Sequence, residues 1–353
     1  MKNEKICIGI SQGDVNGIGC EVILKALSDT RILELLTPVV YSSPKVIAYY
    51  RKVLGLTNMN TVSIRSAEEM QDNRINIVNC ISDEIRVEMG KSTPHGGEAA
   101  LASLQAAVAD MKNGHLDALV TAPVNKHNIQ SEKFNFIGHT EYLQSEFGND
   151  NAFMLMTSDR LRIGILTGHV PLAQAPALIT QEKLLSTLRL INKTMPEDFN
   201  IARPRIAVLS LNPHAGDNGL TGNEEQTVII PALEIAKNEG ILVFGPYSSD
   251  GFFGSDNYLQ FDMTLAMYHD QGMTAFKTLC FESGVNYTAG LSIVRTSPAH
   301  GTGYDIAGKN IASPESFRQA LYMACDIVKN RNQYNLLKEN AMKEVEVKLA
   351  EDN

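Results

Sequence analysis

The chain has 353 residues, a formal net charge of −9, 44% hydrophobic residues and 20% charged residues. This composition is that of a globular protein long enough for two domains, each with its own core, and it excludes a disordered or fibrous chain. The acidic balance, without a dense cluster of Lys and Arg, argues against nucleic-acid binding, and no apolar run approaches the roughly eighteen residues of a membrane span.

Short apolar runs alternate with helical patterns along the chain. A first buried strand is expected over residues 6–10, a helix over 21–27, a second helix around 101–111, and a strand over 116–120. The same alternation recurs over 161–166, 206–211, 228–237, 241–244 and 291–294. Strands that alternate with helices predict βαβ units and a mainly parallel sheet that is covered on both faces.

The two ends of the chain and its cysteines give three further expectations. The apolar stretch at 6–10 is too short for the core of a signal peptide. The five cysteines are scattered, odd in number and without metal spacing, which predicts reduced thiols in a cytoplasmic protein. Ser313-Pro314-Glu315 predicts the start of a final helix that continues into a charged tail.

Three histidines occupy equivalent places in the predicted sheet. His169, His214 and His269 each follow an apolar run that is predicted to be a strand, and each is flanked by turn residues. All three are therefore expected at the carboxyl edge of one sheet, where open α/β folds build their sites. Three imidazoles suit zinc or another first-row divalent ion and leave a coordination position open. Alternatively, each histidine caps a strand or fills a polar gap.

Polar residues in two further segments are candidates for anion binding. Thr140 lies in a turn that leads into a helical pattern, where a hydroxyl and backbone N–H groups can hold an anion. The alternative is that Thr140 is only an N-cap. Lys277 stands in an otherwise apolar segment, and Arg295 is expected to end the strand at 291–294, at the same edge as the histidines. A guanidinium there can bind a phosphate through two hydrogen bonds. Surface salt bridges are the alternative explanation.

Two glycine-rich segments are candidates for nucleotide binding. Residues 13–19 follow the first predicted strand, but their pattern is not the G-x-G-x-x-G fingerprint, so a standard Rossmann site is excluded. Residues 300–309 combine glycines with small polar groups and can wrap an adenosine phosphate, with Asp305 holding a ribose hydroxyl. An ordinary surface turn is the alternative for this second segment.

Taken together, these segments resemble the 4-hydroxythreonine-4-phosphate dehydrogenase family of pyridoxine biosynthesis over nearly the whole chain. The resemblance rests on Gly13-Asp14 with Gly17-Ile18-Gly19, Gly138-His-Thr-Glu, Thr167-Gly-His-Val-Pro-Leu, Leu211-Asn-Pro-His-Ala-Gly, Tyr268-His-Asp-Gln-Gly, Val285-Asn-Tyr-Thr and Arg295-Thr-Ser with His300-Gly-Thr. The 300–309 segment also resembles the adenosine-binding loop of isopropylmalate dehydrogenase, whose fold this family shares. The resemblance therefore implies two α/β domains with mainly parallel sheets and a site in the cleft between them, divided as residues 1–128 plus 296–353 and residues 129–295.

The resemblance also implies roles for individual residues. The implied metal ligands are His169, His214 and His269. The implied substrate-binding residues are His139, Thr140, Lys277, Asn286 and Arg295. Cofactor contacts are expected in the two glycine-rich segments, at Gly13, Asp14, His300, Gly301, Thr302 and Asp305. The implied cofactors are NAD or NADP and one divalent ion (zinc, magnesium or cobalt), and the implied assembly is a homodimer whose sites lie at the subunit interface.

The implied reaction is oxidation of 4-phosphooxy-L-threonine at a secondary hydroxyl. Its product, 2-amino-3-oxo-4-phosphooxybutanoate, loses carbon dioxide to give 3-amino-2-oxopropyl phosphate. Asp270 and Asp250 are the candidates for the proton acceptor, although either can instead orient an imidazole. The alternatives are a dehydrogenase of 4-phospho-threonate or 4-phospho-erythronate, a three-histidine zinc hydrolase of a phosphorylated small molecule, and a non-catalytic binding protein.

This sequence departs from the family pattern in both glycine-rich segments. The first has Val15-Asn16 and Cys20 where members usually have Pro-Ala and Pro. The second has Gly303-Tyr304 where a small residue and an apolar one are common. Neither departure touches the implied metal or substrate residues, but both leave the affinity for the cofactor and the choice between NAD and NADP open.

Overall fold

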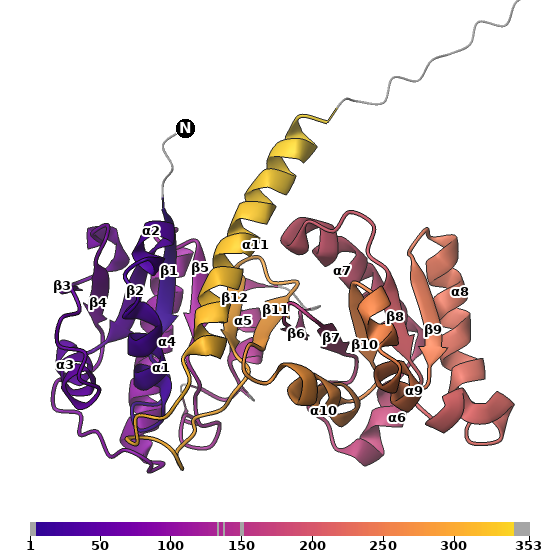
Figure 1. Cartoon of the computed structure of the whole chain (residues 1–353), viewed down its shortest axis with the longest axis horizontal. Helices are drawn as coiled ribbons and strands as arrows, with labels where there is room; N and C mark the ends of the chain where they lie inside the picture. The colour runs from indigo at the N-terminus through magenta and orange to yellow at the C-terminus, as the bar shows by residue number, and fades with distance from the viewer. Residues whose placement is uncertain (1–4, 133, 137, 149–151, 342–353) are drawn as a thin grey trace, which may run out of the picture.

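A single large sheet forms the centre of the molecule (Figure 1). The computed structural model describes residues 5–132, 134–136, 138–148 and 152–341, and within them twelve strands pair in the order β3-β4-β2-β1-β5-β12-β11-β6-β7-β10-β8-β9. In chain order the strands are β1 Ile6–Ser11, β2 Leu36–Ser42, β3 Thr61–Ile64, β4 Ile75–Asn79, β5 Ala118–Thr121, β6 Phe153–Thr157, β7 Arg162–Ile165, β8 Ile206–Leu209, β9 Val243–Tyr247, β10 Met263–Ala266, β11 Val285–Ala289 and β12 Val294–Pro298.

Helices cover both faces of this sheet. They are α1 Gly19–Leu27, α2 Ile32–Leu35, α3 Pro44–Val53, α4 Pro94–Lys112, α5 His139–Phe147, α6 Ala175–Leu178, α7 Gln181–Phe199, α8 Ile230–Asn238, α9 Ser249–Gly254, α10 His269–Cys280 and α11 Glu315–Glu339. Figure 1 shows α11 rising from the middle of the molecule, where it separates the N-terminal half from the half that carries α7 and α8.

Neighbouring residues of the central strands face opposite sides of the sheet, and both sides are buried. Val39 and Leu119 pack with Leu104 of α4 on one face. Val40 and Val120 pack on the other face, in the apolar cluster that also contains α1, α3 and α11. Because both faces exclude water, these strands appear in the sequence as continuous apolar runs rather than as alternating ones.

The direction of the strands changes in the middle of the sheet. From β3 to β12 all neighbouring strands are parallel, and from β7 to β9 they are parallel again. Between these halves, β11 is antiparallel to both β12 and β6, and β6 is antiparallel to β7. The expected α/β fold with mainly parallel strands is confirmed. The proposed division at residues 128 and 296 stays a prediction; residue 128 lies in the loop after β5, and residue 296 lies inside β12.

Most of the expected elements are present. The strand expected at 6–10 is β1, the helix expected around 101–111 is part of α4, and the final helix begins at Glu315. Residues 342–353 of the expected charged tail lie outside the described part of the chain. Within the described part, no helix is both long enough and apolar enough to cross a membrane.

The prediction of a strand over residues 291–294 is wrong. After the turn at Gly290, whose φ is +84°, Leu291 and Ile293 are buried among apolar side chains without being part of a strand, and β12 begins only at Val294. The apolar run thus reflects packing of a loop rather than strand pairing. Arg295 consequently lies inside a central strand, not at the edge of the sheet where the sequence placed it.

A buried polar triad connects α7, β11 and α11. Arg331 donates to Asp198 at 2.6 Å and to the Tyr287 hydroxyl at 2.9 Å, and Tyr287 donates to Asp198. Asp198 and Tyr287 are 3% and 0% exposed. Asp198 therefore depends on the guanidinium for its compensation, because a buried carboxylate without a cation is strongly destabilising.

We predict that Arg331→Met lowers the free energy of unfolding by about 3–5 kcal/mol, because it leaves the Asp198 carboxylate buried without its cation. Urea denaturation followed by circular dichroism measures this change. The matched control is Arg189→Met, which removes a solvent-screened ion pair with Glu239 and should leave the unfolding midpoint nearly unchanged. Equal effects of the two substitutions would contradict the prediction.

Candidate active site

A cavity of about 800 Å³ lies where the two parallel halves of the sheet meet. Its walls come from the end of β5, the first turn of α5, β6, the end of β7, one face of α7, α10, β11 and β12. The charged residues that line it are four cations and one acid, namely Lys126, Lys183, Lys277, Arg295 and Glu141. The cavity is thus suited to an anionic small molecule, although the protein as a whole is acidic.

Arg295 is a buried cation in the floor of this cavity. The residue is 3% exposed, and its guanidinium donates to the hydroxyl of Thr121 on β5 and to the hydroxyl of Thr288 on β11, at 2.6 and 3.0 Å. Burial lowers the pKa of Arg295 to about 10, with nearby Glu141 opposing the shift, so the side chain remains charged at neutral pH. Two hydroxyls orient this charge without neutralising it, and a phosphate can accept its remaining hydrogen bonds.

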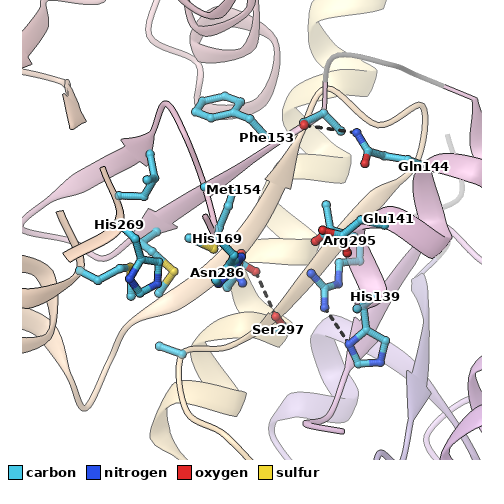
Figure 2. A pocket seen from close by; sticks show the side chains of 18 of the residues that line it. His139, Glu141, Gln144, Phe153, Met154, His169, His269, Asn286, Arg295 and Ser297 are labelled. Atoms are coloured by element: carbon cyan, nitrogen blue, oxygen red, sulfur yellow. Dashed lines mark hydrogen bonds between the residues drawn. The ribbon is translucent and has the colours of Figure 1, made fainter. Parts of the chain in front are cut away.

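His139, the first residue of α5, lies beside Arg295 (Figure 2). Its Nδ1 is 3.3 Å from the Arg295 guanidinium, and its Nε2 is shielded from solvent without a hydrogen-bond partner. Burial, and then the charges of Arg295 and Lys126, lower the pKa of His139 to about 3, so the ring is neutral. Since Nδ1 accepts from arginine, the proton is on Nε2, which can donate to an anionic ligand.

Asn286 of β11 lies between the two ends of the cavity, with His139 and Arg295 to one side and His269 to the other (Figure 2). Its Oδ1 is buried and has no hydrogen-bond partner. An unpartnered buried acceptor is unfavourable, so this amide suits a ligand that donates a hydrogen bond. Thr140 and Lys277 also line the cavity. All five implied substrate residues therefore border one space.

Two of the three candidate metal ligands lie together. His169, in the loop after β7, and His269, at the start of α10, have ring centroids 5.0 Å apart. The Nδ1 of His269 is 2.7 Å from Asp270, which leaves its Nε2 available to a ligand. Desolvation, and then the charges of Lys126 and His269, lower the pKa of His169, which favours the neutral form that binds metals.

His214 lies apart from this pair. It follows β8 in an exposed loop and does not border the cavity. From His214 to Asn218 the backbone is left-handed, with φ between +42° and +80°, which is unfavourable for residues with a side chain. Among the described residues, no three His, Cys, Asp or Glu side chains come together as a metal site. Of the three predicted ligands, His169 and His269 thus lie side by side in the described part of the chain, and His214 does not.

Asp250, the other candidate for the proton acceptor, belongs to the His214 side of the site. Its pKa is lowered first by a hydrogen bond from Ser248, and the charge of His214 contributes to the shift. Both Asp250 and His214 are exposed. Asp250 is therefore near the predicted metal ligand His214, whereas Asp270 is in contact with the predicted metal ligand His269.

A chain of hydrogen bonds that the sequence analysis missed connects the three strand ends that lead to the histidines. Thr167, after β7, donates to the carbonyl of Met267 at 2.9 Å. The Met267 N–H donates to Gln271 at 2.7 Å, and the Gln271 amide donates to the carbonyl of Ser210, after β8, at 2.6 Å. These bonds set the spacing of the strand ends. Gln271 stands in the motif that contains His269, but no sequence pattern indicates which backbone atoms it binds.

The buried carboxylate of Glu225 holds the start of the loop that carries His214. It is 1% exposed and accepts the N–H groups of Leu211 and Asn212 at 2.8 and 2.7 Å. Its other oxygen lies so close to Gly216 that a side chain there would approach to 2.8 Å. Glu225 thus compensates for the unfavourable backbone of the loop that carries His214.

The two glycine-rich segments lie one upon the other. Gly13 has φ +70°, and a Cβ at this position would be 2.3 Å from the carbonyl of Pro123. Asp14 is 1% exposed and is held inside the chain. Thr302 and Asp305 belong to the overlying 300–309 segment, whereas His300 and Gly301 border the cavity. The buried Nε2 of His300 has no hydrogen-bond partner, which suits a ligand that enters along this segment.

Comparison with known proteins adds family evidence to this geometry. The model of the family described as pyridoxal phosphate biosynthetic protein PdxA matches residues 34–324. A 4-hydroxythreonine-4-phosphate dehydrogenase from Bacteroides thetaiotaomicron is 51% identical over 97% of this chain and 94% of its own length. A putative D-threonate 4-phosphate dehydrogenase from Oceanobacillus iheyensis is 37% identical over 92% of this chain and 98% of its own length.

Solved structures agree with the family match. The crystal structure of 4-hydroxythreonine-4-phosphate dehydrogenase from Klebsiella pneumoniae covers 92% of this chain and 100% of its own, with a TM-score of 0.78 and 31% identity. Isocitrate dehydrogenase from Methylococcus capsulatus has a TM-score of 0.50 at 12% identity, which shows a likeness of fold alone. The expected isopropylmalate dehydrogenase-like class is consistent with both likenesses.

The neutral His139 predicts an acid-sensitive fold. Its pKa is depressed in the folded state, so it favours folding above pH 6.5 and opposes it as the pH falls toward 3. Between pH 7 and pH 5 this group should remove about 2 kcal/mol of stability. His139→Asn should therefore flatten the dependence of the unfolding free energy on pH in this range. His95→Asn, at an exposed side chain, is the control, and identical slopes for His139→Asn and the wild type would refute the prediction.

Proposed function

Since the chain belongs to the PdxA family of pyridoxal phosphate biosynthetic proteins, we propose that it is a 4-hydroxythreonine-4-phosphate dehydrogenase. It oxidises 4-phosphooxy-L-threonine with NAD or NADP to 2-amino-3-oxo-4-phosphooxybutanoate, which then loses carbon dioxide to give 3-amino-2-oxopropyl phosphate. The observation that carries this assignment is the cavity itself. A buried, unneutralised guanidinium lies at one side of it and a pair of imidazoles at the other.

We assign the phosphate of the substrate to the side of the cavity that holds Arg295. The guanidinium, the Nε2–H of His139 and the first turn of α5 at Thr140 all offer donors there. Lys277 adds a second positive charge from α10. Binding the phosphate here fixes the opposite end of the molecule, so that the energy of a remote contact orients the hydroxyl that reacts.

We place the divalent ion at His169 and His269, with His214 as the third ligand. The two neighbouring imidazoles fit such an ion, because their neutral nitrogens are good donors to zinc and cobalt. Held by these imidazoles, such an ion would supply Lewis-acid chemistry at the oxygen that reacts. The contact of Asp270 with Nδ1 of His269 orients that imidazole. Asp250, which accepts a hydrogen bond from Ser248, is the other candidate for the proton acceptor.

We propose that a second copy of the chain completes the site. His169, His214, Asp250 and Lys277 are all exposed in the single chain, which leaves the reacting groups open to water. Two leucines near them are also exposed, Leu172 at 68% and Leu220 at 88%. A homodimer that buries this surface would exclude water from the reaction. It would also bring His214 close to His169 and His269, so that three imidazoles can bind one metal ion.

The nicotinamide cofactor is assigned to the 300–309 segment, with His300 and Gly301 toward the cavity and Thr302 and Asp305 toward the adenosine half. Asp305 is exposed and free to accept ribose hydroxyls. Gly13 and Asp14 are buried beneath this segment. We therefore propose that they support the segment and do not contact the cofactor. A cytoplasmic location stays a prediction that rests on the scattered positions of the cysteines, which lack metal spacing.

A second candidate function is oxidation of 4-phospho-threonate, in which a hydroxyl replaces the amine. The observation that favours it is the likeness to the Oceanobacillus protein. Both substrates share the phosphate and the reacting hydroxyl and differ only at the neighbouring carbon. The zinc hydrolase is not favoured, because the named relatives are dehydrogenases.

We predict turnover of 4-phosphooxy-L-threonine with NAD or NADP and a divalent ion, measured as absorbance of the reduced nicotinamide. Kinetics with the 4-phosphates of threonine, threonate and erythronate in parallel identify the substrate by the highest kcat/KM. Preference for threonate would transfer the assignment to the second candidate. Release of inorganic phosphate without any reduction of the cofactor would reject a dehydrogenase altogether.

We predict that His214→Ala abolishes turnover and lowers the content of bound zinc or cobalt while leaving the far-ultraviolet circular dichroism unchanged, because the side chain is exposed and not part of a core. The control is His127→Ala, at another exposed histidine away from the cavity, which should keep both turnover and metal. Full activity and metal content in the His214 variant would remove it from the ligand set.

A further inference from the structure

The 300–309 segment is tied to the body of the protein at both of its ends. Near its start, the N–H of Ile18 donates to the carbonyl of Thr302 at 2.9 Å. Gly17 makes this approach possible, because a Cβ there would be 2.6 Å from the Thr302 oxygen. Just beyond the segment, the N–H of Ala312 donates to the buried carboxylate of Glu21 at 3.0 Å. The segment therefore has fixed ends although its outer residues are exposed.

Between these ends, the side chain of Tyr304 connects the segment to Asp14. Its hydroxyl donates to Asp14 Oδ2 at 2.7 Å. Burial, and then the hydrogen bond to Asp14, raise the pKa of Tyr304 to about 12, so the phenol keeps its proton and remains the donor. Asn125 and Ser92, which hydrogen-bond to each other, oppose this shift of the pKa. The side chain of Tyr304 thus joins the middle of the segment to the buried carboxylate of Asp14.

Asp14 is held in place to receive this hydroxyl. Its carboxylate accepts the N–H of Asn16 at 2.8 Å and the side-chain amide of Asn128 at 2.7 Å. Tyr304 is the third donor to this carboxylate. A buried carboxylate with three donors has a fixed orientation, so it can serve as an anchor for the segment.

Asn16 extends the same network to residues 88–93. Its side chain accepts the N–H of Glu88 at 2.7 Å and donates to the hydroxyl of Thr93 at 2.9 Å, and its carbonyl accepts the N–H of Gly90 at 2.8 Å. An alanine at position 16, as the family pattern usually has, lacks both side-chain bonds, and an apolar residue at 304 lacks the bond to Asp14. The two departures of this sequence therefore meet around one carboxylate.

We propose that Tyr304 is a positioning residue for the dinucleotide cofactor, whose hydroxyl bond to Asp14 holds the 300–309 segment in the shape that receives the adenosine half. This inference rests on the proposed function, because it assumes that the segment binds the cofactor. The physical reason is preorganisation: a segment that is already ordered loses less conformational entropy when the ligand binds. The effect belongs to cofactor affinity and not to the chemical step, because Tyr304 does not border the cavity.

The test is Tyr304→Phe, which removes one oxygen atom and keeps the ring. We expect the Kd for NADH, measured by fluorescence of the bound nicotinamide without substrate, to rise about tenfold, as is typical when a hydrogen bond to a charged group is lost. Hydrogen exchange of the amides of residues 301–309 should become faster in the free enzyme. The KM for the cofactor should rise with it, while kcat at saturating cofactor stays within about twofold.

Two further variants identify the partner of the hydroxyl and control for the loss of a phenol. In an Asp14→Asn background the effect of Tyr304→Phe should shrink, because the charged acceptor is already gone. Tyr322→Phe removes a hydroxyl from α11, outside the segment, and should leave both the Kd and the exchange rates unchanged. If Tyr304→Phe raises the Kd for NADH but leaves the hydrogen exchange of residues 301–309 unchanged, Tyr304 contacts the cofactor directly. That outcome would overturn the positioning role.

Asp305→Ala separates this inference from the proposed function. If Asp305→Ala weakens NADH binding and Tyr304→Phe does not, the segment binds the cofactor but the positioning role of Tyr304 is wrong. If neither variant weakens it, the cofactor binds elsewhere, and both the proposed cofactor site and the inference fail. Weakening by both, with faster exchange only in the Tyr304 variant, supports the inference.

Discussion

The buried charge of Arg295 is the constraint around which the centre of this molecule is organised. The guanidinium lies inside β12, with hydroxyls from β5 and β11 as its hydrogen-bond partners. Within the described part of the chain, no carboxylate lies within ion-pair distance of it. A desolvated cation without a counter-ion is unfavourable for folding, and an anion that enters the cavity removes this penalty. The proposed binding of the substrate phosphate at Arg295 would thus draw part of its energy from a destabilised, prearranged site.

The same principle of prearrangement extends to the candidate ligands. The strand ends after β7, β8 and β10 are joined through Thr167, Gln271 and their backbone partners, so the loops that carry the histidines start from fixed points. Glu225 then supports the left-handed turn at His214. Unfavourable backbone of this kind persists only where the surroundings over-determine it, and such places are commonly functional. The rigid scaffold and the exposed histidines are the features on which the proposed completion of the site by a second copy rests.

The 300–309 segment, the proposed cofactor loop, is a third prearranged element. The first glycine-rich segment does not present its glycines to a ligand but lies beneath the 300–309 segment, with Gly17 and Asp14 as points of contact. Asn16 and Tyr304 both form hydrogen bonds around Asp14, so polar contacts order this segment.

The sequence by itself determined the α/β class and most of the strands and helices, because apolar periodicity and turn residues are local signals. The five implied substrate residues that border the cavity came from the family resemblance and not from periodicity. It could not place Arg295, since the buried run at 291–293 is a loop whose apolar side chains pack without strand pairing. It also missed Gln271 and Glu225, whose partners are backbone atoms distant in the chain. Only the tertiary structure decided that His169 and His269 meet while His214 lies apart, because the separation of strand ends depends on sheet order and on long-range hydrogen bonds. Those quantities are properties of the packed chain, and no local pattern of residues encodes them.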